Sequence, residues 1–125
     1  QAGLQYAAAL KIYPDNRALL YGYADHFLAL KQADNAIQLV KEKQRLYPKD
    51  AQFYEVLAKA YTIQNKMLLS HQAQGEAYFR KYDLKRAIEQ MELAVKAKDG
   101  DFYQHSIVEA RLKELQRMQG EDKKG

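Results

Sequence analysis

A serine, a histidine and a glutamate lie close together in the stretch "MLLSHQAQGEAYFRKYD" at residues 67–83. Ser70, His71 and Glu76 are the residue types of a nucleophile, a general base and a carboxylate that orients the base. The composition of the stretch is helical, and neighbouring residues on a helix point about 100° apart, so Ser70 and His71 cannot meet. No carboxylate is placed to orient the imidazole. The spacing argues against a catalytic site, and Gly75 at the centre of the helix calls for a packing explanation.

Other chemistry is equally poorly supported. The three histidines, His26, His71 and His105, show neither His-x-x-x-His nor Glu-x-x-His spacing, and the chain has no cysteine. We therefore expect no metal site and no cofactor in this chain. There is no glycine-rich phosphate loop and no apolar run of about 18 residues that could span a membrane. The net charge of +4 comes from 20 basic and 16 acidic residues spread along the chain, which does not indicate a nucleic-acid surface.

An internal repeat organises the chain. "KIYPDN" at 11–16 and "RLYPKD" at 45–50 are alike, and the positions of their prolines, Pro14 and Pro48, differ by 48 − 14 = 34. Each Tyr-Pro pair is expected to end a helix, because proline cannot continue a helix and disfavours helical angles in the residue before it. A period of about 34 residues with helix-sized segments between the prolines indicates a helix–turn–helix repeat.

The core positions of this repeat resemble those of the tetratricopeptide repeat. With position 1 three residues after the first proline, the small residues Ala24 and Ala36 fall at positions 8 and 20. The larger Phe27 and Val40 fall at positions 11 and 24. Small residues let two helices approach closely, and large ones fill the flanking gaps. We expect an all-α fold, a tetratricopeptide-repeat superhelix of about seven antiparallel helices.

The phase of the repeat slips by one helix near residues 51–67. In the unshifted frame Gln74 would occupy the large core position 24, which it suits poorly. A frame shifted by half a repeat places Gly75 at position 8, Ala87 at position 20 and Met91 at position 24. Either residues 51–65 form an extra helix, or the helix at 67–82 serves two neighbours.

Two apolar stripes on the helix at 67–82 favour the second interpretation. Leu69, Ala73 and Ala77 form one stripe, and His71, Gly75, Tyr78 and Tyr82 form the other. From its place at position 8, we expect Gly75→Ala to be tolerated and Gly75→Leu to cost roughly 1–3 kcal/mol through overpacking.

The ends of the chain give the domain boundaries. Counting backward places Ala2, Tyr6 and Ala9 at second-helix core positions, so the chain starts halfway through a repeat and we expect a longer parent protein. We expect Asp101 to be the N-cap of a final helix. This helix would cover the last apolar face of the array. The predicted organisation is a repeat domain at 1–118, with its capping helix at 102–118, followed by a flexible tail at 119–125.

The remaining candidate function is protein binding on a concave groove. In such superhelices, positions 2, 5, 9, 12 and 13 of each first helix face the groove. The familiar clamp for C-terminal carboxylates has lysine at position 5 and asparagine at position 9, and this chain lacks it. Mixed groove charges count against an RNA-binding repeat. The candidate groove residues are Tyr21, Asp25, Leu28, Glu55, Lys59, Gln72, Glu76, Phe79 and Arg80.

Three longer stretches carry a more particular resemblance. They are "YPDNRALLYGYADHFLAL", "LLSHQAQGEAYFRKYDLKRAIEQMELAVK" and "GDFYQHSIVEARLKELQ". Together they resemble the C-terminal repeat domain of bacterial periplasmic zinc metallopeptidases, the beta-barrel assembly-enhancing protease and its relatives. The resemblance covers residues 1–118.

This resemblance implies a periplasmic domain that is not itself an enzyme. The family carries His-Glu-x-x-His in an N-terminal peptidase domain, and this chain has no such motif, so no catalytic or zinc residue carries over. Zinc is expected only in that absent domain. The implied partners are the outer-membrane assembly machinery, misassembled outer-membrane proteins and the chain's own peptidase domain. A tetratricopeptide-repeat scaffold unrelated to proteolysis remains the alternative.

Overall fold

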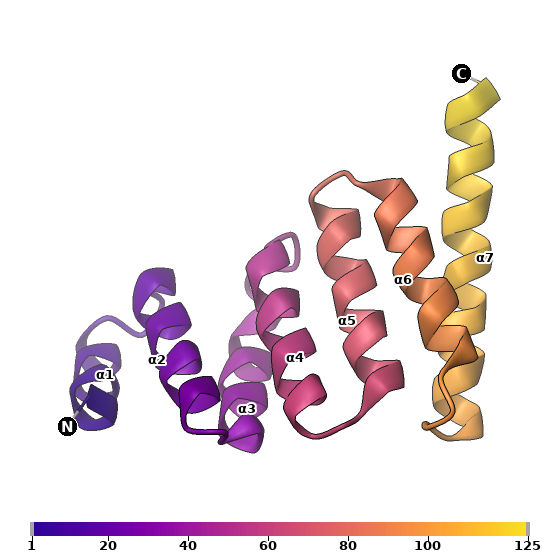
Figure 1. The fold of residues 1–125 in the computed structure, drawn as a ribbon. Coiled ribbons are helices and arrows are strands. Elements are labelled where there is room, and N and C mark those ends of the chain that lie inside the picture. Colours follow the sequence, from indigo (N-terminus) through magenta and orange to yellow (C-terminus); the bar gives the residue numbers. More distant parts are fainter. Residues whose placement is uncertain (1, 125) are drawn as a thin grey trace.

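The computed structural model describes residues 2–124, and the side chains of residues 2–121. Within that range the chain forms seven helices and no strand, which confirms the predicted all-α fold (Figure 1). None of these helices combines the length and the hydropathy needed to cross a membrane. The helices are α1 (Ala2–Ile12), α2 (Arg17–Ala29), α3 (Ala33–Gln44), α4 (Ala51–Ile63), α5 (Met67–Arg80), α6 (Leu84–Lys96) and α7 (Phe102–Lys124).

The helices lie side by side in one row, with α1 at one end and α7 at the other (Figure 1). Both predicted Tyr-Pro breaks are confirmed, because α1 and α3 end just before them. The predicted N-cap of the last helix, α7, is confirmed: the amide of Gln104 donates to Asp101 Oδ1 over 2.7 Å. The end of this helix differs from the prediction: residues 119–124 continue α7 where a tail was expected. Residue 125 lies outside the described residues.

One type of turn recurs at three places along the row. Lys31, Asn65 and Tyr82 have φ values of 60°, 59° and 64° and end helices α2, α4 and α5. In each turn, the amide of the following residue donates to the carbonyl five residues earlier, over 2.8–3.0 Å. The intervals between these turns are 65 − 31 = 34 and 82 − 65 = 17, a full period and then half of one. The half-repeat slip is therefore present in the backbone: α5 is the second helix of a hairpin with α4 and the first helix of a hairpin with α6.

Side-chain contacts confirm that α5 serves two neighbours. On one side, the Ser70 hydroxyl donates to the backbone carbonyl of Ala58 over 3.1 Å and lies 2.7 Å from the Thr62 hydroxyl, both on α4. On the other side, His71 Nδ1 is 2.9 Å from Gln90 Oε1 on α6. A helix packed on both sides needs small side chains where its neighbours come closest.

Gly75 lies at the closest approach of α5 to α6. A methyl group there would lie 2.9 Å from Met91 Cε, 3.3 Å from Met91 Cγ and 3.2 Å from the backbone oxygen of Ala87. Both neighbours are fully buried, so they have little room to move. This geometry confirms the shifted frame, in which these three residues share a contact. It also gives alanine at position 75 a packing cost, which the expectation that Gly75→Ala is tolerated did not include.

One member of the predicted stripes is misplaced. Because α5 ends at Arg80, Tyr82 falls in the turn, where its side chain is 95% exposed. The other three, His71, Gly75 and Tyr78, are buried or half-buried towards α6. The helical periodicity does not continue to Tyr82, because the turn there has a left-handed backbone conformation that a right-handed helix does not contain.

The start of α5 is capped from a distant segment. Its own N-cap residue, Lys66, makes no capping bond. Instead, the Asp99 carboxylate from the α6–α7 loop accepts from the amides of Met67 (2.6 Å) and Leu68 (2.9 Å). A carboxylate at a helix N-terminus satisfies free amides and complements the helix dipole. The cap therefore ties the α6–α7 loop to α5.

Candidate protein-binding surfaces

The predicted surface residues divide between two faces of the row, because α5 turns one side to each. Gln74 and Glu76 are two positions apart, so their side chains point about 160° apart around the helix axis. Gln74 shares a hollow with Glu55 and Lys59 of α4, whereas Glu76 bonds to Arg111 of α7. We call the first side the α4 face and the second side the α7 face. The predicted residues therefore do not line one continuous groove.

The three predicted residues of α2 have different environments. The Tyr21 phenol donates to the Asp50 carboxylate, and its ring centroid lies 5.3 Å from that of Phe53. Burial, together with the hydrogen bond to Asp50 and its charge, raises the pKa of Tyr21. Asp25 is exposed. Leu28 is buried in the core, so this candidate groove residue does not lie on an open surface.

The α4 face is a shallow polar surface. Glu55 forms an ion pair with Lys81, which follows α5, and Lys59 is exposed one turn further along α4. With Gln74 and Tyr78 these side chains line a hollow of about 210 Å³. The Glu55–Lys81 ion pair is partly exposed, so it contributes little to stability, roughly 0–1 kcal/mol.

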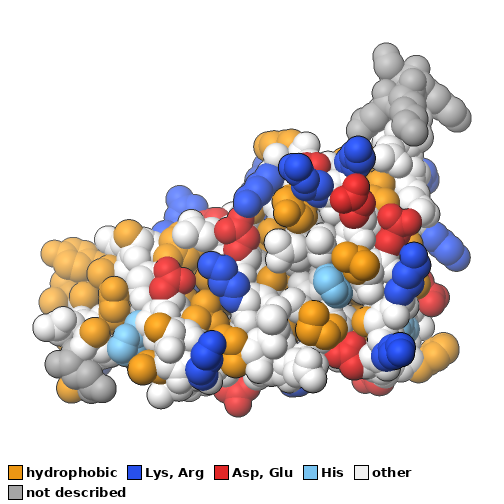
Figure 2. Space-filling view, viewed as in Figure 1, with side chains coloured by type: hydrophobic (Ala, Val, Ile, Leu, Met, Phe, Trp, Pro, Cys, Tyr) orange, Lys and Arg blue, Asp and Glu red, His pale blue; other side chains and the backbone are white. Residues whose placement is uncertain are grey.

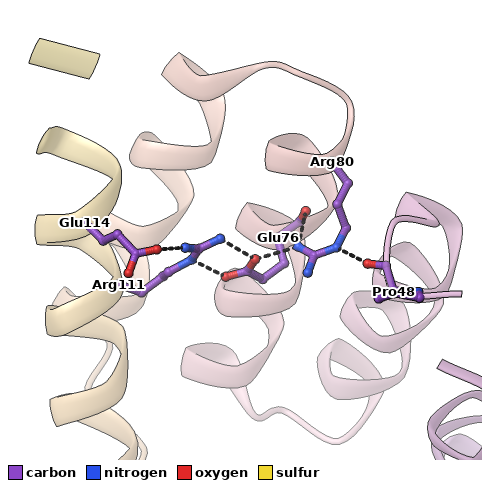
Figure 3. A network of polar contacts seen from close by, with 5 residues as sticks. All are labelled: Pro48, Glu76, Arg80, Arg111 and Glu114. Carbon is purple, nitrogen blue, oxygen red and sulfur yellow. Dashed lines mark hydrogen bonds and ion pairs between the residues drawn. The ribbon is translucent and has the colours of Figure 1, made fainter. Parts of the chain in front are cut away.

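The α7 face is built around a network of charged side chains (Figure 3). Both oxygens of Glu76 accept from Arg111, over 2.8 Å from Nε and 3.0 Å from Nη2. Arg80 Nη1 donates to the same carboxylate over 2.6 Å, and its Nε donates to the backbone oxygen of Pro48 over 2.7 Å. Arg111 also pairs with Glu114. The network thus joins α5, α7 and the loop before α4.

This network is partly buried, which strengthens its interactions. The side chains of Glu76, Arg80 and Arg111 are 15%, 20% and 21% exposed. Burial alone would lower the pKa of Arg111, but its hydrogen bonds to Glu76 and the charges of Glu76 and Glu114 outweigh burial and raise that pKa. A bidentate arginine–carboxylate pair also fixes the orientation of the two side chains. The pair therefore holds α7 rigidly on α5.

Aromatic rings flank the network on the α7 face. The Arg111 guanidinium lies 4.6 Å from the centroid of the Phe79 ring, and the Arg80 guanidinium lies 4.2 Å from that of Tyr54. Both distances suit cation–π contacts. Gln72 is half-buried, one turn before Glu76 on the same side of α5. Four of the predicted residues, Gln72, Glu76, Phe79 and Arg80, are therefore brought together here.

The three residues of the catalytic types, Ser70, His71 and Glu76, are held apart. Ser70 bonds to α4, His71 bonds to Gln90 of α6, and Glu76 bonds to Arg111 of α7. No three His, Asp or Glu side chains in the described part of the chain are grouped so that they could hold a metal ion.

Sequence reasoning missed Arg111 as the partner of Glu76. The two are 35 residues apart on helices that are not consecutive. The only local signal is the spacing of Arg111 and Glu114, which predicts a pair on the surface of one helix. Nothing in a single sequence points from α7 to Glu76.

No family model matches this chain, and no curated protein matches it significantly.

Proposed function

We propose that this chain is a non-catalytic protein-interaction domain built of tetratricopeptide repeats. The observation that carries the proposal is the packing register of α5 and α6, in which Gly75 faces Ala87 and Met91. Small and large residues at these positions are the pattern of that repeat. In α2 and α3, the corresponding Ala24, Ala36 and Val40 are all buried. Such arrays work by presenting a rigid surface to a protein partner.

The α7 face supplies such a surface. Its charged side chains are held in place by one another, and an aromatic ring lies beside them. Side chains that are already ordered lose little conformational entropy when a partner binds. This favours protein recognition, in which arginine and aromatic residues provide most of the binding energy.

We further propose that the domain belongs to a periplasmic zinc metallopeptidase and docks it to the outer-membrane assembly machinery and to misassembled outer-membrane proteins. The support is the sequence resemblance over residues 1–118. Its most particular stretches coincide with helix joints: Ser70 and His71 bond to the helices on either side of α5, and Asp101 and Gln104 cap α7. In this proposal, zinc and the catalytic residues lie in the peptidase domain.

The docking part can be tested by retention on the immobilised chain. Detergent-solubilised outer membranes that contain the barrel-assembly machinery are passed over the chain, and an unrelated helical-repeat protein serves as the control column. We expect the assembly components to be retained by this chain alone. Retention of other proteins without assembly components would favour the scaffold unrelated to proteolysis.

The non-catalytic part is tested separately. The purified chain is incubated with casein, with and without added zinc, and fragments are followed by mass spectrometry. We expect no cleavage above that of a buffer control. Zinc-dependent cleavage by this chain would refute the non-catalytic assignment, whatever the retention experiment gives.

A further inference from the structure

Tyr82 is an aromatic residue in a conformation that disfavours it. Its φ of 64° is one that glycine and asparagine adopt readily, and asparagine occupies the equivalent turn position at Asn65. Its side chain is 95% exposed, so packing does not account for it. Lys31 has the same conformation in the first of these turns, so strain alone does not distinguish Tyr82. What distinguishes it is a large exposed ring that lies beside other apolar side chains.

A hollow of about 630 Å³ lies beside this ring. Phe79, Leu84 and Met118 form its apolar wall, from the end of α5, the start of α6 and the second half of α7. Lys49, Arg80 and Glu121 complete the lining. The three apolar side chains are each half-buried, so they belong to the fold and also face the hollow.

A second hollow, of about 660 Å³, adjoins the first at the same edge of the row. Arg17, Tyr21 and Tyr47 line it, and Lys49 lines both hollows. Because they meet at Lys49, the two hollows together form a trough beside the α3–α4 loop and the α5–α6 turn. That loop and that turn lie along the upper edge of the ribbon in Figure 1. Several basic side chains lie along this upper edge in Figure 2, interspersed with acidic ones. We call this trough the loop-edge trough.

Lys49 is a charged side chain of the loop-edge trough that forms none of the salt bridges among the described residues. Arg17 pairs with Asp50, Arg80 pairs with Glu76, and Glu121 pairs with Arg117. No salt bridge among the described residues includes Lys49, whose side chain is exposed. A ligand that fits this site brings a carboxylate to Lys49 and an apolar group to the hollow beside it.

We propose that the loop-edge trough binds an extended segment of a partner protein in which a bulky apolar side chain stands next to an acidic one. The apolar side chain enters the hollow between Phe79, Leu84 and Met118, beneath the Tyr82 ring, and the carboxylate pairs with Lys49. This inference rests on the proposed protein-binding function and adds the surface and the chemistry of the segment.

The trough suits a peptide better than a nucleic acid. Single-stranded nucleic acids need free aromatic faces and several unpaired cations. Here the Tyr47 ring carries the Arg17 guanidinium at 4.6 Å, and the Tyr21 ring packs on Phe53. These two rings are already occupied. Among the described residues, the trough keeps one free ring, Tyr82, and one cation outside the salt bridges, Lys49, which is fewer than a strand of stacked bases needs.

The test uses fluorescent Gly/Ser peptides and the whole chain. One peptide carries a central Leu-Phe-Asp-Glu, the second Leu-Phe-Lys-Lys and the third Ser-Ser-Asp-Glu, and binding is measured by fluorescence anisotropy. We expect the first to bind at least about tenfold more tightly than either of the others, because both parts of the site must be filled. Equal binding of all three would overturn the proposal, as would tighter binding of a single-stranded oligonucleotide.

Three substitutions locate the site. Lys49→Glu should weaken binding of the first peptide by about tenfold or more. Tyr82→Gly should weaken it by about fivefold while leaving the melting temperature unchanged or higher, since glycine relieves the strained φ. Lys59→Glu is the matched charge reversal on the α4 face and should leave binding unchanged. Loss of binding in Lys59→Glu with no effect of the other two would place the site elsewhere.

The same variants separate this inference from the proposed function. If the assembly components are still retained by Lys49→Glu and Tyr82→Gly as well as by the wild type, the docking proposal stands and the loop-edge trough is excluded as its surface. If the wild type retains none of them, the docking proposal fails, whereas the peptide result still decides the trough.

Discussion

Gly75→Ala should destabilise the protein, although alanine is the better helix former. The exchange adds up to about 1 kcal/mol of helix propensity in favour of folding. Against it, the new methyl group would lie 2.9 Å from Met91 Cε and 3.2 Å from the Ala87 backbone oxygen. Overpacking a full core typically costs about 1–3 kcal/mol. We expect a net loss of about 1 kcal/mol in the free energy of unfolding.

The proposed cause of this loss can be isolated with a double-mutant cycle. Met91→Ala alone should cost about 2–5 kcal/mol, because it empties a fully buried site. In the double variant, the methyl group at position 75 no longer meets the Met91 side chain. It also fills part of the space that the Met91 side chain leaves. The double variant should therefore be more stable than the sum of the single effects predicts, by about 1 kcal/mol or more.

The assay is urea unfolding followed by circular dichroism at the helical minimum. Gly120→Ala in α7 is the control, because a methyl group there meets nothing within 4 Å. It should leave stability unchanged or raise it by up to about 1 kcal/mol. If Gly75→Ala is as stabilising as Gly120→Ala, or if the two α5–α6 substitutions are additive, the close-contact explanation is wrong.

Three further predictions follow from single contacts. Asp99→Ala should cost about 1–2 kcal/mol in urea unfolding, because two α5 amides lose their cap; an unchanged midpoint would mean that water replaces the cap. Arg111→Met should lower the free energy of unfolding by only about 1–2 kcal/mol, because Arg80 still pairs with Glu76. If replacing an exposed arginine with methionine costs as much, the network adds nothing to stability. The pKa of Tyr21 is raised above its ordinary value of 10.0, so its share of stability is complete below about pH 10 and falls as pH rises further. Tyr21→Phe should therefore lose less stability than the wild type between about pH 9 and about pH 11, as measured by unfolding at each pH.

Local patterns in the sequence predicted the elements and their packing well. The Tyr-Pro breaks and the Asp101 cap depend on residues within one helix or turn, and the repeat period follows from finding the same turn twice. The shifted frame placed Gly75 against α6, because small residues at fixed spacing follow from the geometry of one hairpin.

What could not be predicted depends on contacts between distant segments. Glu76 meets Arg111 from a helix that is not its neighbour in sequence, and Asp99 caps a helix that starts 32 residues before it. Counting within a regular repeat places Leu28 on an open groove, whereas the core encloses it. Helical periodicity does not place Tyr82 correctly, because a left-handed turn ends α5 and no glycine in the sequence marks that turn.

The spacing of the three left-handed turns, one full period and then half of one, has a consequence for how such arrays change over time or by design. In a regular array each added hairpin extends the same surface. If a single helix is gained or lost instead, the first helices of all later hairpins move to the side of the array where the second helices lay before. Here the half-period step turns Glu55 towards the α4 face and Glu76 towards the α7 face. Inserting one helix between Asn65 and Met67 would return Glu55 and Glu76 to the same side. The side on which a helical-repeat array presents its surface residues can therefore be changed by adding or removing one helix.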